Sequence, residues 1–402
     1  MISAQQAKDI IGEKTQPFKQ SERVRFLDSP GRVLAEDVRA TSDLPPFSRA
    51  TVDGFAVKCG DIGAAGASNP VKLKIVDVVQ AGRPSRKILK SGQAVKIMTG
   101  GVIPKGADCV VMKEYAEIIG KDVLISKGEK KDSGISFQGE SAKKGKLLLA
   151  RGNRITSGVV SLLASLGLPF VKVTRKARVA ILVTGNELLN VNQKLSPGKI
   201  RSSNQYGLFT QVKEAGGEPT ILGIARDNPK DTRNKILRGL THDLLLISGG
   251  VSVGDFDLVP GILKSLGLKI FIEKVAMQPG KPLIFGKKKN TYVFGLPGNP
   301  VSTMVCFYEF VRPCLLKMSG ANDIALPKGE ATLDEEIKLS FQRTKYLRAK
   351  TFLKNGRVFA RLTSHQGSGN ILSLAEADCL IEIAEGVTKV AKGSRVTIEY
   401  LV

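Results

Sequence analysis

The sequence of 402 residues has no tryptophan and only two histidines, His242 and His365. A histidine-rich metal site and a Ser-His-Asp triad both depend on imidazole groups, so both kinds of site are disfavoured. The five cysteines form no Cys-x-x-Cys pair. Their odd number and scattered positions favour a reducing compartment over a disulfide framework.

Long hydrophobic runs are also absent. No stretch of eighteen apolar residues occurs, so we expect no membrane span. The segment 1–5 lacks the basic-then-apolar pattern of a secretory signal, and a cytoplasmic location is therefore expected. The length predicts about two to four domains, and a hydrophobic content of 42% is sufficient for their cores.

Acidic residues are scarce relative to basic ones. The chain has 61 Lys and Arg against 37 Asp and Glu, a net charge of +24. The basic runs at 127–131, 143–146 and 287–289 lie beside glycines and contain no interleaved aromatics. A solvated basic surface that attracts small anionic substrates is therefore favoured. Nucleic-acid binding stays open as an alternative that only the charge supports.

Two glycine-rich turns, at 248–255 and 295–302, are the most informative feature. Their sequences are Ser-Gly-Gly-Val-Ser-Val-Gly-Asp and Gly-Leu-Pro-Gly-Asn-Pro-Val-Ser. Each follows a short apolar run and precedes a segment with helical spacing. That arrangement directs backbone N–H groups and the positive end of a helix at an anion. We predict a phosphorylated ligand between the turns, with Asn299 as an N-cap and Pro300 as the first helical residue.

Residue types in the first turn suit an anion site. Gly249 and Gly250 allow close approach of the backbone to a ligand, and Ser252 offers a hydroxyl donor. Asp255 and Asp257 follow directly. Because carboxylates repel a phosphate unless a cation lies between them, we expect Mg²⁺ at this position. The alternative is that the glycines only form tight strand-to-helix turns.

Secondary-structure patterns predict a multidomain protein with α/β and β parts. Helical spacing covers 3–40 and 155–167, and regular strand–helix alternation predicts a three-layer α/β domain with a parallel or mixed sheet. The predicted domains are a discontinuous helical linker (1–50 and 141–177), an inserted β domain (51–140), the α/β domain (178–326) and a barrel-like C-terminal β domain (327–402).

Polar residues follow four strands of the predicted α/β domain, at 184–187, 226–227, 248–257 and 297–299. Ligands of such sheets bind at the carboxyl ends of the strands. Since four strand ends carry polar groups, we predict that they form one site.

Ordered motifs extend across essentially the whole chain. They are Pro-Pro-Phe at 45–47, Val-Asp-Gly-Phe-Ala-Val at 52–57, Ile-Met-Thr-Gly at 97–100, Thr-Gly-Asn-Glu-Leu at 184–188, the two glycine turns, Met-Gln-Pro-Gly-Lys-Pro at 277–282 and His-Gln-Gly-Ser at 365–368. Together these motifs resemble the molybdopterin molybdenumtransferase family, which includes the E domain of gephyrin.

The resemblance implies both an architecture and an activity. It implies an elongated homodimer, with each active site between the α/β domain of one subunit and the inserted and C-terminal β domains of the other. Members of the family insert molybdenum from molybdate into the dithiolene of adenylylated molybdopterin and release AMP, with Mg²⁺ as the usual cation. We also expect contact with the molybdopterin adenylyltransferase.

The resemblance also assigns roles to residues. The catalytic candidates are Asp53, Thr99, Glu187, Asp227, Asp257, Lys274 and Lys281, with Asp227 and Asp257 as the metal pair. The substrate-binding candidates are Ser248, Gly249, Gly250, Ser252, Gly254, Pro297, Gly298, Asn299, Arg348 and Ser368. Of these, Arg348 and Ser368 match positions near the molybdate site. Asp53 could instead cap a turn, Glu187 could be a solvated helix-start acid, and Lys274 a surface lysine. His365 is expected to be structural.

Three positions depart from the family pattern. Ser141, Asn186 and Gln278 stand where the family often has Asp, Asp and Lys. Because Glu187 and Asp227 remain among the acids, we expect an active enzyme. The alternatives are a molybdopterin-binding scaffold and an adenylyltransferase of the same pathway, whose fold corresponds roughly to the α/β domain alone.

Overall fold

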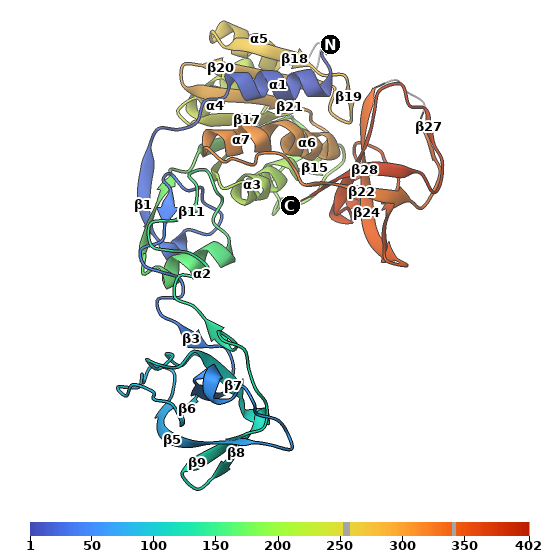
Figure 1. Ribbon diagram of the computed structural model, residues 1–402. Helices are drawn as coiled ribbons and strands as arrows, with labels where there is room; N and C mark the ends of the chain where they lie inside the picture. Colours follow the sequence, from blue (N-terminus) through green and yellow to red (C-terminus); the bar gives the residue numbers. More distant parts are fainter. Residues whose placement is uncertain (252–257, 340–342, 402) are drawn as a thin grey trace. The chain divides into compact units, whose positions relative to one another are not determined.

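The computed structural model describes residues 1–251, 258–339 and 343–401 (Figure 1). The chain forms two compact units, which are described separately. The larger unit comprises Met1–Glu36, Arg151–Ser161 and Pro169–Val402, and the smaller comprises Asp37–Ala150 and Leu162–Leu168. No helix within the described ranges is both long and apolar enough to cross a membrane.

A six-stranded mixed sheet forms the centre of the larger unit. In sheet order its strands are β16 (Glu218–Ala225), β13 (Arg178–Thr184), β17 (Leu244–Ser248), β21 (Thr291–Leu296), β20 (Pro282–Lys288) and β18 (Lys269–Lys274). The first four run parallel, and β20 and β18 are antiparallel to their neighbours. β17 and β21 are buried along their whole length, as strands covered on both faces must be.

Helices cover both faces of this sheet (Figure 1). One face packs against α1 (Ala4–Lys14), α3 (Asn204–Glu214), α6 (Pro300–Cys306), the π-helical turn η4 (Phe307–Val311) and α7 (Arg312–Met318). The other face packs against α4 (Pro229–Gly239) and α5 (Leu258–Ser265). The predicted three-layer α/β domain with a mixed sheet is therefore confirmed.

The predicted helix over 3–40 is wrong beyond Lys14. Ser3 and Gln6 form a reciprocal capping box at the start of α1, but Thr15 is already extended, and Pro17 then prevents a further turn. The chain continues into strands, among them β1 (Ser21–Arg25), which pairs with β12 (Phe170–Thr174). The helical spacing at 155–167 does correspond to a helix, α2 (Ser157–Ser165).

The smaller unit is built on a second six-stranded sheet. In sheet order its strands are β7 (Cys109–Met112), β4 (Gly54–Val57), β6 (Gln93–Ile97), β5 (Val71–Val79), β9 (Asp122–Ile125) and β8 (Ala116–Ile119). Gly54 is required where β4 pairs with β7, because a Cβ atom there would lie 1.8 Å from the carbonyl oxygen of Val111. Two short pairs extend this unit: β2 (Val38–Arg39) with β11 (Leu147–Leu149), and β3 (Arg49–Ala50) with β10 (Ile135–Ser136).

A closed five-stranded barrel forms the C-terminal part of the larger unit. The sequence analysis predicted a barrel-like β domain in this part of the chain. Its strands are β24 (Thr344–Lys354), β25 (Arg357–Leu362), β22 (Lys328–Leu333), β28 (Arg395–Tyr400) and β26 (Cys379–Ile383), and β26 returns to pair with β24. One short helix, α8 (Leu372–Ala375), interrupts the expected β pattern. The short strand β19 (Met277–Gln278) from the α/β part pairs with β24.

A buried charge cluster joins this barrel to α1 and η4. Lys8 lies 2.5 Å from the Glu309 carboxylate and 3.9 Å from Glu399, and Lys328 lies 3.0 Å from Glu399 and 2.9 Å from Glu382. Burial raises the pKa of Glu309 to about 8, against the opposing effect of Lys8. A protonated Glu309 leaves Lys8 and Lys328 facing the carboxylates of Glu399 and Glu382, so the charges of this partly exposed cluster balance.

This cluster makes stability depend on pH. Between the ordinary pKa near 4.5 and about 8, the folded protein holds a proton that the unfolded chain releases. The free energy of unfolding should therefore fall as pH rises through this window, by at most about 1.4 kcal/mol per pH unit. We predict that Glu309→Gln, which imitates the protonated acid, flattens this slope in urea unfolding measured at several pH values.

The matched control for this test is Glu330→Gln, because the Glu330 side chain is 71% exposed. It should retain the wild-type slope. Equal slopes in wild type and Glu309→Gln would show that Glu309 carries no proton in the folded state.

Candidate functional site

A cavity of about 560 Å³ lies at the carboxyl ends of the parallel strands, and we call it the strand-end cavity. Predicted residues from all four strand ends line it: Glu187, Asp227, Ser248, Gly249, Gly250, Pro297, Gly298 and Asn299. The structure thus brings together the polar strand ends that the sequence placed far apart. Ser252, Gly254, Asp255 and Asp257 lie outside the described residues.

The first glycine turn is pressed against the end of β13. Gly249 and Gly250 have φ of +95° and +65°, a region that favours glycine. A Cβ atom on Gly249 would lie 2.7 Å from the Thr184 carbonyl oxygen, and one on Gly250 would lie 2.9 Å from the Thr184 hydroxyl. Gly298 of the second turn is close by, because its Cβ would lie 3.6 Å from the Gly249 Cα. The cavity wall is therefore bare backbone from two turns in contact.

Asn204 ties the two turns together, and the sequence analysis missed it. Its Nδ2 donates to Ser248 Oγ at 2.8 Å and to the Gly298 carbonyl oxygen at 2.8 Å. Ser248 Oγ in turn donates to the Pro297 carbonyl oxygen at 3.0 Å. The hydroxyl of Ser248, a predicted substrate-binding residue, is therefore used inside the protein. No sequence motif marked Asn204, since its partners lie on other elements.

Buried acceptors without partners also occur around this network. The Oδ1 atom of Asn204 and the Oγ atom of Ser202 are buried and have no hydrogen-bond partner among the described residues. Both residues line the strand-end cavity. Because an unpaired buried acceptor is costly, a ligand with N–H donors would gain from reaching them.

Acidic groups follow the ends of β13 and β16 and line the same cavity as the first turn. Asn186 N donates to Asp227 Oδ2, and Asp227 N donates to Asn186 Oδ1, both at 3.2 Å. Asn186, a departure from the family pattern, thus supplies the acceptor that an Asp would supply. The Glu187 carboxylate lies over Gly185, where a Cβ would be 2.5 Å from it. Within the described ranges no group of three or more His, Cys, Asp or Glu could hold a metal ion.

A second cavity of about 610 Å³, the barrel pocket, lies between the segment at 277–282 and the barrel. It contains the predicted residues Lys281, Arg348 and Ser368. Its charged lining is entirely basic among the residues the structure describes: Lys281, Lys338, Arg343, Lys345 and Arg348. Such a lining favours an anion.

Two of these cations are buried. The Arg348 side chain is fully buried, with Nε donating to Ser373 Oγ and Nη2 donating to the Gly367 carbonyl oxygen, and burial lowers its pKa to about 10. Lys345 is 7% exposed, and burial lowers its pKa as well. Lys345 was missed by the sequence analysis. It lies opposite Gln278 in the β19–β24 pair, beside a position where the family often has Lys.

Asn299 links the two cavities. It occupies the N-cap position of α6, as predicted, but its side chain makes no capping hydrogen bond. Instead, Asn299 Nδ2 donates to Ser368 Oγ at 2.9 Å, which fastens the strand-end cavity to the barrel pocket. The capping role expected for its side chain was therefore wrong.

The other predicted residues lie elsewhere. Lys274 is exposed at the end of β18 and lines neither cavity. In the smaller unit, Thr99 N and Thr99 Oγ1 both donate to Asp53 Oδ1, at 2.8 and 2.7 Å. These bonds lower the pKa of Asp53, so its carboxylate stays ionised. His365 Nδ1 accepts from Gly367 N at 3.0 Å, a local contact in the loop before Ser368.

Comparisons with known proteins cover nearly all of the chain. Residues 2–167 match the MoeA N-terminal region (domain I and II), residues 180–317 match a probable molybdopterin binding domain, and residues 330–401 match the MoeA C-terminal region (domain IV). These three matches follow one another without overlap.

Individual relatives are similar over most of their length. The molybdopterin molybdenumtransferase of Bacillus subtilis (strain 168) is 38% identical over 387 residues, which is 94% of this chain and 89% of that protein. That of Staphylococcus epidermidis is 36% identical over 376 residues, 93% and 90% of the two chains. The crystal structure of the molybdopterin biosynthesis moeA protein from Pyrococcus horikoshii OT3 superposes with a TM-score of 0.85 at 28% identity, covering 100% of both chains.

We predict that replacement of glycine by alanine changes the free energy of unfolding more in the first glycine turn than in the second. Gly249→Ala should lower the free energy of unfolding by about 2–4 kcal/mol, because it adds a backbone clash at Thr184 and a strained positive φ. Gly298→Ala should change it by less than about 1 kcal/mol, since its Cβ meets an ordinary contact. Urea unfolding of both variants tests this. Similar losses in both variants would contradict the proposed contact between Gly249 and Thr184.

Proposed function

Because this chain belongs to the molybdopterin molybdenumtransferase family of enzymes, we propose that it inserts molybdenum from molybdate into the dithiolene of adenylylated molybdopterin. The adenylate is cleaved and AMP is released. The observation that carries this proposal is the pairing of two cavities with different chemistry. A glycine-walled cavity suits a phosphorylated ligand, and the barrel pocket beside it holds buried cations and, in the described part of its lining, no acid.

Molybdate is assigned to the barrel pocket. Lys281, Lys345 and Arg348 supply positive charge, and the Ser368 hydroxyl supplies a hydrogen-bond donor for a tetrahedral dianion. The buried cations favour the dianion because little water competes for it. In the transfer, bonds from molybdenum to oxygen are exchanged for bonds to the two dithiolene sulfurs, and the displaced oxygen leaves as water.

The adenylylated substrate is assigned to the strand-end cavity. Backbone from both glycine turns can approach its phosphates, and the unpaired acceptors of Ser202 and Asn204 suit N–H groups of a pterin. Asn299 and Ser368 would hold the two substrates next to each other, because they bridge the cavities. This proximity is the main contribution expected from the protein.

The donor set of the strand-end cavity fits Mg²⁺. Magnesium in enzymes takes one or two carboxylates and completes its shell with water and substrate phosphate, and Asp227 and Glu187 present exposed carboxylates there. We propose that Asp227 holds it together with Asp257. When bound, Mg²⁺ neutralises the phosphate bridge that is cleaved.

We further propose a homodimer in which Asp53 and Thr99 of one subunit complete the site of the other. In this proposal the α/β domain and the C-terminal β domain of one chain share a site, and not those of two chains as the resemblance implied, because Asn299 bonds to Ser368 within the chain. The ionised Asp53 would act on the substrate across the interface, while Lys274 would add positive charge at the rim. We propose that the molybdopterin adenylyltransferase supplies the substrate by direct contact. We also propose a cytoplasmic location, which agrees with the five free thiols.

The activity is tested by AMP release from adenylylated molybdopterin with Mg²⁺, with and without molybdate. Release should depend on molybdate, and the product should activate a cofactor-free molybdoenzyme. We predict that Lys345→Met raises the molybdate concentration needed for half-maximal rate at least about tenfold, because a buried cation is lost. Tight substrate binding without release in the wild type would instead indicate a scaffold.

The control for Lys345→Met is Lys350→Met, an exposed position on the same strand. It should leave the molybdate dependence unchanged. A Lys345→Met enzyme with wild-type molybdate dependence would remove Lys345 from the proposed molybdate site.

The shared site is tested by mixing subunits. Asp53→Ala and Lys281→Met should each abolish most turnover with little change in melting temperature. When the two variants are unfolded, mixed and refolded together, mixed dimers contain one intact site. About a quarter of wild-type activity should return. If no activity returns, either Asp53 and Lys281 of one chain belong to the same site, or Asp53 belongs to no site.

A further inference from the structure

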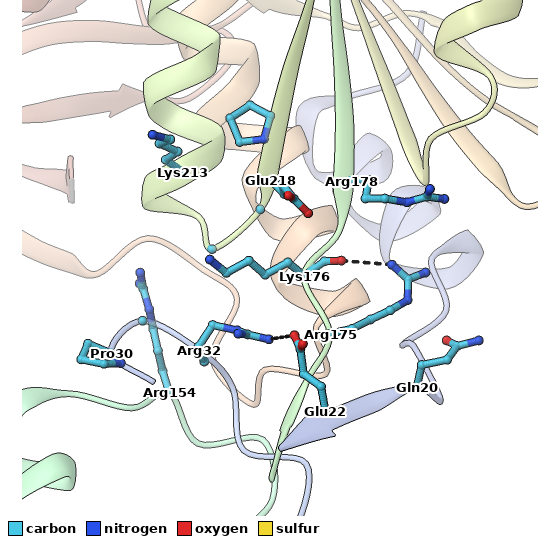
Figure 2. A pocket seen from close by; sticks show the side chains of 14 residues that line it. Gln20, Glu22, Pro30, Arg32, Arg154, Arg175, Lys176, Arg178, Lys213 and Glu218 are labelled. Carbon is cyan, nitrogen blue, oxygen red and sulfur yellow. Dashed lines mark hydrogen bonds and ion pairs between the residues drawn. The ribbon is translucent and has the colours of Figure 1, made fainter. Parts of the chain in front are cut away.

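A third cavity, of about 930 Å³, lies in the larger unit, and we call it the arginine cavity (Figure 2). Arg178 and Glu218 on its wall are the first residues of β13 and β16. The strand-end cavity begins at the last residues of these strands. Because a seven-residue strand spans about 20 Å, the arginine cavity is separate from the proposed reaction site.

The charged lining of this cavity is strongly basic. It consists of six cations and two carboxylates among the described residues: Arg32, Arg154, Arg175, Lys176, Arg178, Lys213, Glu22 and Glu218. The lining therefore carries a charge of 6 − 2 = +4. Like charges gathered in one hollow repel one another unless an anion lies among them.

Internal partners hold some of these cations in place. Arg32 is 8% exposed and donates to the Glu22 carboxylate and to the Thr174 carbonyl oxygen. Arg175 donates to both oxygens of Asp243, at 2.7 and 2.9 Å, and its guanidinium lies 3.7 Å from the centre of the Phe18 ring. Asp243 thus offsets one of the positive charges of the lining. The guanidiniums of Arg32 and Arg175 are oriented by these contacts before any ligand binds.

Three cations form no ion pair among the described residues. Arg154 donates to the carbonyl oxygen of Glu214 at 2.7 Å. Lys213 lies over the Phe209 ring, and Lys176 forms no ion pair within the described part of the chain. In Figure 2, Arg154, Lys176 and Lys213 stand on one side of the cavity, while Arg175 and Arg178 stand on the other.

We propose that the arginine cavity binds a linear phosphate chain, as in inorganic triphosphate or a nucleoside triphosphate. The charge of three to four negative units on such a chain matches the excess of cations, and guanidinium forks suit phosphate oxygens. The volume is that of a small-molecule site. Gly216, with φ of +82°, and Gly31 form a rim with no side chain, where a phosphate can approach the backbone.

Binding of inorganic triphosphate at physiological salt, measured by calorimetry, tests the proposal. Lys176→Glu/Lys213→Glu should bind at least about tenfold more weakly than wild type. These side chains are exposed and make no ion pairs in the described structure, so the fold should persist. If this double variant does not fold, Lys176→Gln/Lys213→Gln serves instead, with the same expected direction.

A matched control separates the site from the general charge of the protein. Lys269→Glu/Lys289→Glu makes the same change in net charge in another basic hollow, which Lys14, Lys269, Lys287, Lys288 and Lys289 line. It should weaken triphosphate binding less than about twofold. Equal weakening in both double variants, or no binding by the wild type at millimolar triphosphate, overturns the proposal.

An acidic peptide is the competing occupant. A glutamate peptide of equal charge should bind more weakly than triphosphate and should not displace it. Displacement of triphosphate by the peptide at equal concentration overturns the phosphate assignment. This measurement needs no molybdenum transfer, so its outcome is independent of the proposed activity.

Discussion

The contact between the first glycine turn and the end of β13 determines the functional face of this protein. Gly249 and Gly250 lie so close to Thr184 that no side chain fits between them. Because that turn is bare backbone, the second turn at Gly298 can touch it, and Asn204 can bond to both. Four strand ends therefore converge on one cavity instead of ending in separate loops. Mixed sheets generally bind ligands at such an edge.

Two clusters of charged residues differ in whether their charges are balanced. The cluster of Lys8, Glu309, Glu399, Lys328 and Glu382 is partly buried, its charges balance when Glu309 is protonated, and it joins the barrel to α1 and η4. In the barrel pocket, Arg348 and Lys345 are buried, and no acid occurs in the part of the lining that the structure describes. A buried cation without an anion is costly. The balanced cluster is thus a structural junction, whereas the barrel pocket is a site that gains stability when an anion binds.

Sequence patterns predicted those features that depend on neighbours along the chain. Strand, glycine turn and helix follow one another in both motifs, so the α/β domain and the convergence at 184–187, 226–227 and 297–299 were foreseeable. The helix predicted over 3–40 ended at Lys14, since local spacing carries no information on where Thr15 turns extended. Asn299 was predicted to cap α6, but its side chain makes no capping hydrogen bond for a similar reason: its amide bonds to Ser368, which is distant in sequence.

The sequence by itself determined the order of domains, the glycine positions and the excess of positive charge, because these follow from composition, period and backbone freedom. Only the tertiary structure decided which charges are buried, which hydroxyls are used internally and which cations gather in a hollow. Ser248, Lys345 and the lining of the arginine cavity show this. Each depends on atoms brought together by packing of the sheet, the helices and the barrel, and such contacts between distant segments leave no periodic signal in the chain.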